Sequence, residues 1–209
     1  MPFETKPGVQ RRPALLRQLS VLSCALLLHG LPSAVLARDK PARAEAGDAP
    51  RIMSAQGTQQ AAFAPWDDIE GLIVENLNAA RKQVLVQAYL LTNQKITDAL
   101  IAAHKRDVDV RVLMDGGQLD KNSTKRVIAM REAGIGIWLE TLYRSAHNKV
   151  IVIDPALPRA TVITGSFNFT WSAQHKNAEN ILVLRDNPAL AASYAANWQR
   201  HRQDAQAYP

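Results

Sequence analysis

The chain has 209 residues, 47% hydrophobic and 21% charged, which is ordinary globular composition for one domain with appendages. The net charge of +6 is compatible with a polyanionic partner but does not by itself indicate one. The single cysteine, Cys24, lies in the N-terminal leader described next, which excludes disulfides and thiolate zinc sites from the mature chain.

Residues 1–37 predict a secretory signal peptide. Four basic residues precede the apolar run "LSVLSCALLLHGLPSAVLA", and the small residues before Arg38 predict cleavage after Ala37. His29, Gly30 and Pro32 interrupt the run, which is therefore too short for the about 20 apolar residues of an anchor helix. We expect a periplasmic or secreted protein without stable membrane association, whose mature chain keeps 21 basic and 18 acidic residues.

Residues 38–60 are rich in alanine, charge and loop-forming residues and lack periodicity, which predicts a flexible linker. Helical spacing and apolar runs then alternate, predicting helices at 66–82, 95–106 and 121–133 and strands at 83–90, 108–115 and 134–140. Three consecutive strands follow at 149–154, 160–167 and 179–186, before a last helix at 187–203. This order predicts one α/β domain, 61–209, with a mixed sheet flanked by helices on both faces.

Polar residues at the ends of these buried strands need a chemical reason. His147 and Lys149 are two residues apart and therefore share a face, and Ser166 and Asn168 share a face in the same way. Phe167 and Phe169 should then point into the core, and Gly165 permits close backbone approach. An imidazole, an ammonium, a hydroxyl and a carboxamide suit a phosphoryl group, with the histidine as the reactive partner.

Two carboxylates complete the candidate set. Glu179 begins the next strand and is expected to hydrogen-bond to the ring of His147, leaving the other ring nitrogen as the nucleophile. Asp154 should face away from His147, which favours a structural role. A metal site of His147, Asp154 and His175 is disfavoured, because Lys149 would repel a cation. We therefore expect neither a metal nor another cofactor.

The stretch "HNKVIVID", followed by "GSFNF", resembles the H-x-K-x4-D motif and trailing G-S-x-N of the phospholipase D superfamily. From about Ala61 to Tyr208 the chain is similar to its small, single-motif bacterial endonucleases. The resemblance implies a phospholipase D-like α-β-α sandwich, a phosphohistidine intermediate and no metal. It gives a catalytic set of His147, Lys149, Asp154 and Glu179, with phosphate contacts from Lys149, Ser166 and Asn168.

One departure from the family pattern is the spacer between Asp154 and Gly165. It has ten residues, "PALPRATVIT", more than family members carry. Because the flanking strands stay in phase, we expect a longer hairpin turn. A shifted register would instead turn Ser166 and Asn168 away from the site.

A single motif predicts a homodimer. In-line displacement at phosphorus places nucleophile and leaving oxygen on opposite sides, so one His147 cannot also protonate the leaving group. His104, His175 and His201 lack a lysine two residues on, which indicates ordinary structural or surface roles. We therefore expect a two-fold dimer whose two motifs share one site and titrate as a coupled pair.

The leading functional hypothesis is a metal-independent phosphodiesterase that hydrolyses DNA, or RNA, with little sequence specificity. Tyr143, Arg144 and Lys176 would line its groove with Trp171, for which core packing is the alternative. Two rival functions remain open, a phospholipase acting on lipid phosphodiesters and a module that binds nucleic acid without cleaving it.

Overall fold

The computed structural model describes residues 52–209, so the predicted signal peptide and the linker up to residue 51 lie outside the described residues. One sheet dominates this part, with the strand order β1-β7-β6-β5-β2-β3-β4-β8. The strands are β1 (Thr58–Ala64), β2 (Gln83–Ala88), β3 (Asp109–Asp115), β4 (Gly136–Glu140), β5 (Lys149–Ile153), β6 (Thr161–Gly165), β7 (Glu179–Arg185) and β8 (Gln206–Ala207). Strands β2, β3 and β4 run parallel and the other pairings are antiparallel, so the predicted mixed sheet is confirmed.

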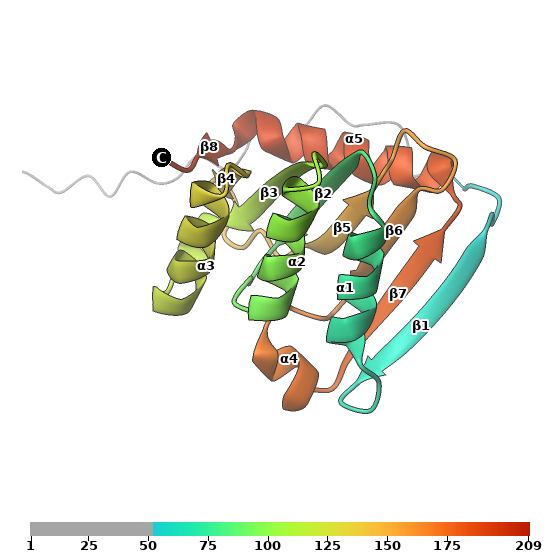
Figure 1. Ribbon diagram of the computed structural model, residues 1–209, viewed down its shortest axis with the longest axis horizontal. Helices are drawn as coiled ribbons and strands as arrows, with labels where there is room; N and C mark the ends of the chain where they lie inside the picture. The colour runs from blue at the N-terminus through green and yellow to red at the C-terminus, as the bar shows by residue number, and fades with distance from the viewer. Residues whose placement is uncertain (1–51) are drawn as a thin grey trace, which may run out of the picture. The chain divides into compact units, whose positions relative to one another are not determined.

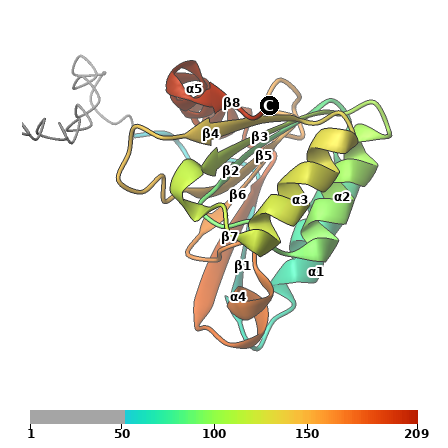
Figure 2. The same cartoon turned by 90° about the vertical axis from the view of Figure 1, so that its left-hand side faces the viewer.

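Helices cover both faces of the sheet, as predicted. The long helices are α1 (Ile69–Ala79), α2 (Gln94–His104), α3 (Lys121–Glu132) and α5 (Pro188–Asp204). Figure 1 shows α1, α2 and α3 in front of the strands, and Figure 2 shows α5 on the opposite side of the sheet from these three. A short 3-10 turn, η1 (Gly116–Gln118), follows β3, and a short helix, α4 (Trp171–His175), precedes β7.

Side-chain alternation along the central strands builds a core on each face. Val84 and Val86 of β2 pack with the apolar faces of α1, α2 and α3. Leu85, from the same strand, packs with Trp198 of α5. The Trp198 indole nitrogen donates to the Val86 carbonyl oxygen at 2.9 Å, so this buried ring has both apolar contacts and a hydrogen-bond acceptor.

The sequence analysis missed β1, α4 and β8. Strand β1 begins at Thr58, so the last three residues of the predicted linker belong to the folded domain. Its sequence, "TQQAAFA", is exposed along most of its length and lacks a strong apolar alternation. What holds it is antiparallel pairing with β7 from Thr58↔Arg185 to Ala64↔Glu179, a long-range contact that local sequence does not reveal.

The helices of residues 52–209 include none with both the length and the apolarity required to cross a bilayer.

Candidate active site

The predicted site residues gather at one end of the sheet. Lys149, the first residue of β5, pairs with Ala88 at the end of β2. Gly165, the last residue of β6, pairs with Ile181 near the start of β7. Because these neighbours are antiparallel, the start of one strand meets the end of the next. The residues placed at this end are His147, Lys149, Ser166, Asn168 and Glu179.

His147 and Lys149 share a neighbour in Tyr89, which follows β2. The Tyr89 and His147 ring centroids are 4.3 Å apart, and the Lys149 ammonium lies 4.8 Å from the Tyr89 centroid. The ammonium also donates to the His147 carbonyl oxygen at 2.8 Å. The imidazole and the ammonium therefore lie on one patch, as the two-residue spacing predicted.

Lys149 is a buried cation. Only 6% of the residue is exposed, while His147 beside it is exposed. Burial lowers the pKa of the Lys149 amine, and the negative charge of Glu179 partly offsets this effect. Within residues 52–209 no carboxylate forms an ion pair with Lys149. A partly desolvated cation without an ion-pair partner favours binding of an anion.

Glu179 contacts Ser166, and the expected hydrogen bond to His147 is not found among the described residues. Ser166 Oγ donates to one carboxylate oxygen at 2.6 Å, and the Asn177 side chain donates to the other at 2.9 Å. The Ser166 hydroxyl in turn accepts the Asn180 backbone N–H at 3.1 Å. The prediction was wrong on this contact because β6 and β7 are neighbours, whereas His147 precedes β5, one strand further away. Glu179 orients Ser166 and acts on Lys149 through its charge.

Asn168 has a side-chain oxygen that is buried and has no hydrogen-bond partner within residues 52–209. Phe167 and Phe169 on either side are 0% and 2% exposed, which confirms the predicted alternation. Gly165 is required for strand packing, because a Cβ at this position would lie 2.2 Å from the Asn180 carbonyl oxygen. The close approach predicted for Gly165 is therefore made by β7.

Asp154 lies at the opposite end of β5 from Lys149, where its contacts are those of a structural residue, so its inclusion in the catalytic set stays a prediction. Its carboxylate accepts the backbone N–H groups of Arg81, Lys82 and Gln83 at 2.7–2.9 Å. These residues lead into β2, so Asp154 fixes where that strand begins. The placement of Asp154 also separates it from His147 and His175, which removes the alternative metal set. No three metal-ligating side chains gather elsewhere in residues 52–209.

The long spacer after Asp154 forms a hairpin turn and leaves the register intact. Strands β5 and β6 pair regularly from Val150↔Thr164 to Ile153↔Thr161. The extra residues therefore lie at the end of the sheet opposite His147. The expectation of a longer turn is confirmed.

The aromatic and histidine residues outside the motif divide into three settings. Trp171 is 56% exposed, which rules out core packing, and its ring lies against His175 with centroids 4.6 Å apart.

His201 contacts the buried Glu140 at 2.5 Å, and Tyr143 packs on the His201 ring. Burial raises the pKa of Tyr143, with a further contribution from the charge of Glu140. His104 Nδ1 lies 3.4 Å from the Val108 carbonyl oxygen at the end of α2, which is a structural contact.

Comparison with known proteins decides the family. The family model described as "Cardiolipin synthase, PLD-like domain" matches residues 73–202. The chain belongs to the phospholipase D superfamily. The chain is similar to Nuc from Salmonella typhimurium, a phospholipase D family member of known crystal structure. The two sequences are 32% identical and the structures match with a TM-score of 0.69, over 72% of this chain and 97% of Nuc.

Two further relatives extend this assignment. "Phospholipase D" of Rickettsia prowazekii is 40% identical over 136 residues, which are 65% of this chain and 63% of the relative. This chain thus spans less than two thirds of that curated relative. NucT from Helicobacter pylori shares the fold, with a TM-score of 0.64 at 19% identity, over 72% of this chain and 99% of NucT.

Two residues of this phospholipase D superfamily site were not found from the sequence. Tyr89 was assigned only to a strand, although "AYL" places its ring beside the motif. Asp115 ends β3, and its carboxylate accepts the Ala146 N–H at 2.5 Å and the Gly117 N–H at 2.8 Å. Asp115 therefore fixes the residue that precedes His147. The signal available was Asp-Gly-Gly at the end of a strand, but Asp115 was assigned only to the predicted strand 108–115.

Proposed function

We propose that this protein is a metal-independent phosphodiesterase that hydrolyses nucleic acid, with His147 as the nucleophile. The observation that carries the proposal is the pairing of an exposed imidazole with a buried ammonium that has no ion-pair partner in residues 52–209. Lys149, Ser166 and Asn168 would hold the non-bridging phosphate oxygens. The chemistry then needs positioning and charge stabilisation, which these groups supply.

The reaction proceeds in two displacements. A ring nitrogen of His147 attacks phosphorus, the N–P bond forms, and the P–O bond to the leaving group breaks. The leaving oxygen takes a proton from an imidazole on the far side of the phosphate. Water then attacks phosphorus and gives its proton to that second imidazole, and the N–P bond breaks to release the phosphate monoester and free His147.

A second copy of the chain would supply the second imidazole. The motif occurs once in the sequence. No other histidine of residues 52–209 has a lysine two residues further along the chain. We expect a mass of two subunits by light scattering. A monomer that turns over at full rate would contradict this arrangement.

Nucleic acid is favoured over lipid by the surface next to the site. The exposed Trp171 follows the G-S-x-N segment, and the Lys176 ammonium lies 5.8 Å from its ring centroid. Aromatic platforms flanked by cations suit bases and phosphates. The resemblance to small single-motif endonucleases supports the same choice. The name of the Rickettsia relative, "Phospholipase D", keeps lipid hydrolysis as the second candidate.

The decisive assay uses plasmid and single-stranded DNA, RNA and phospholipid vesicles, each in EDTA, with His147→Ala as the control. Cleavage of nucleic acid by the wild type alone supports the proposal. Hydrolysis of vesicles alone supports a phospholipase, and binding without cleavage supports a non-catalytic module. Loss of cleavage in EDTA would exclude the metal-independent mechanism.

Export forms part of the same proposal. Residues 1–37 would be removed on secretion, and the nuclease would act in the periplasm or outside the cell. N-terminal sequencing of the mature protein should give Arg38 as the first residue. An intact leader in a protein recovered from the cytoplasm would contradict this proposal.

A further inference from the structure

A cavity lies beside the end of the sheet that carries the candidate site, between the segment that follows β2 and helix α4. Its volume is about 510 Å³, within the range of about 300–1,000 Å³ typical of ligand pockets. Trp171 and His175 form an aromatic wall of this cavity. Polar groups on the remaining wall come from Thr92, Asn93, Gln94 and Arg126. None of these residues belongs to the catalytic motif.

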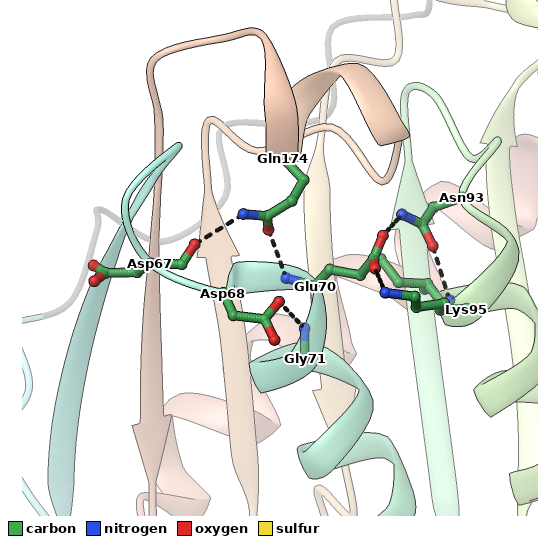
Figure 3. A network of polar contacts seen from close by, with 8 residues as sticks. Asp67, Asp68, Glu70, Gly71, Asn93, Lys95 and Gln174 are labelled. Carbon is green, nitrogen blue, oxygen red and sulfur yellow. Dashed lines mark hydrogen bonds and ion pairs between the residues drawn. The ribbon is translucent and has the colours of Figure 1, made fainter.

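A buried polar network supports the floor of this cavity. Figure 3 shows the Glu70 carboxylate accepting hydrogen bonds from the Asn93 amide and the Lys95 ammonium, the latter at 2.5 Å. Glu70 and Asn93 are only 4% and 3% exposed, whereas the Lys95 side chain is 75% exposed. The hydrogen bond and charge of Glu70 raise the pKa of Lys95. The buried carboxylate therefore fixes an accessible cation at this cavity.

Gln174 connects the same network to the aromatic wall. Its side-chain oxygen accepts the Glu70 N–H and its amide donates to the Asp67 carbonyl oxygen, both at 2.9 Å (Figure 3). Gln174 is 6% exposed and belongs to α4, which also carries Trp171 and His175. The exposed indole of Trp171 is therefore carried by α4, and the hydrogen bonds of Gln174 hold this helix against the start of α1. Such a platform is pre-organised for stacking.

The cavity and the catalytic groups are joined by short extended segments. Thr92 and Asn93 both donate their N–H groups to the Phe169 carbonyl oxygen at 3.0 Å. Tyr89, which contacts His147, is three residues from Thr92, and Asn168 is three residues from Trp171. Three extended residues span at most about 11 Å. A polynucleotide with a phosphate at His147 can therefore place a nearby base in the cavity.

We propose that this cavity binds one unstacked nucleobase of the strand whose phosphate lies at His147, with Trp171 as the stacking surface. The proposal rests on the proposed nuclease function and adds a base subsite to it. Stacking on an aromatic ring combined with donors and acceptors around its edge is how single-stranded bases are recognised. The exposed carboxylate of Asp98, which also lines the cavity, is an acceptor suited to the amino group of a base.

The test compares Trp171→Ala with Trp66→Ala on labelled single-stranded oligonucleotides. Trp66 is a matched control, because it is 84% exposed and does not line this cavity. Stacking of one base on an aromatic ring predicts a rise in KM of about five- to hundredfold for Trp171→Ala. Trp66→Ala should leave KM unchanged, and Trp171→Phe should restore most of the affinity.

A set of oligonucleotides with a single abasic site moved past the cleaved bond gives the second readout. At one position near that bond, the missing base should raise KM of the wild type as much as Trp171→Ala does. In Trp171→Ala the same abasic site should add nothing, because base and ring act as one interaction. A merely structural role of Trp171 would leave the abasic effect intact.

The outcomes separate the two proposals. Cleavage by wild type with KM unchanged in Trp171→Ala, or with an abasic effect that persists in this variant, overturns the base subsite alone. A wild type that cleaves no oligonucleotide while hydrolysing vesicles overturns the nuclease proposal, and the subsite with it. A non-additive pair of effects at one position supports the subsite.

Discussion

Strand β5 has a charged residue at each end, and the two side chains differ in how fully their hydrogen-bonding groups are paired. Lys149 begins the strand with a buried ammonium whose one hydrogen bond is to a backbone carbonyl, while Asp154, just after it, accepts three backbone amides. The buried side-chain groups without partners in residues 52–209 are Gln87 and Asn168. Both lie near the Lys149 end, because Gln87 pairs with Val150.

This difference separates structural polar groups from those available for ligand binding. A buried carboxylate with all its hydrogen bonds made has nothing left to offer a ligand, whereas an unpaired buried group costs stability and needs an explanation. Both charges belong to one motif, H-x-K-x4-D. The motif therefore combines a reactive end with an anchor for β2, about five residues apart along the strand.

The largest expected effect is at the reactive end. His147→Ala should lower kcat/KM for nucleic acid by roughly 10³- to 10⁶-fold, because it removes the proposed nucleophile. The exposed side chain contributes little to packing, so the melting temperature should stay near the wild-type value. His104→Ala is the matched control and should retain activity. Substantial cleavage by His147→Ala would remove the basis of the comparison.

Lys149→Met should lower kcat/KM by about 10²- to 10³-fold, because the charge on the phosphate oxygens is no longer stabilised. In the wild type the lowered pKa of Lys149 means that its ammonium loses a proton at a lower pH in the folded protein than in the unfolded chain. Stability in the wild type should therefore rise with pH between that lowered pKa and the ordinary value of 10.5. In the variant this rise should be absent.

The measurement for Lys149 is chemical denaturation across alkaline pH together with a kcat/KM profile. Activity of the wild type should fall as the amine deprotonates, earlier than for an ordinary lysine. Lys82→Met, at the exposed far end, is the control and should change neither curve. Identical stability profiles for Lys149→Met and wild type would argue against the desolvated ammonium.

Asp154→Ala should act on stability at the opposite end. Three amides lose their acceptor, so the free energy of unfolding should fall by roughly 2–4 kcal/mol in urea denaturation. Alanine also disfavours the left-handed backbone at this position, where φ is 50°. Asp154→Asn, which tolerates that φ, should lose less. At low temperature the folded fraction of either variant should cleave at nearly the wild-type rate, and a specific loss of kcat would instead support the inclusion of Asp154 in the catalytic set.

Asn168→Ala should give the smallest effect, a decrease in kcat/KM of about tenfold. The side-chain oxygen has no partner in residues 52–209, so its removal should change the free energy of unfolding by less than about 1 kcal/mol. Asn78→Ala, at an exposed asparagine of α1 outside the site, is the control and should change neither quantity. A large loss of stability in Asn168→Ala would show that this end is structural as well.

Much of this organisation could be predicted from local patterns. The alternation of Phe167 and Phe169 with the neighbouring polar residues predicted which side chains point out of the core. The in-phase strands predicted that the longer spacer would not shift the register of β5 and β6. The direction of the Glu179 carboxylate could not be predicted. It depends on which strands are neighbours, and the sheet order is set by long-range packing.

The same limit explains the other misses. Strand β1 has weak local signals and depends on β7, and the anchor at Asp115 depends on a loop that returns from β4. Trp171 was left between core and surface because a five-residue helix is too short to show a periodic face. Apart from this short helix, the missed features are contacts between segments distant in the sequence.

The hairpin between β5 and β6 has a practical consequence for handling the protein. Its tip, at Pro158 and Arg159, is solvent-exposed and lies at the end of the sheet opposite His147. An affinity handle or a fluorophore inserted there, or a linker to a solid bead, leaves the catalytic edge facing free solution. The lengthened turn thus offers an attachment point through which turnover can be followed on an immobilised enzyme.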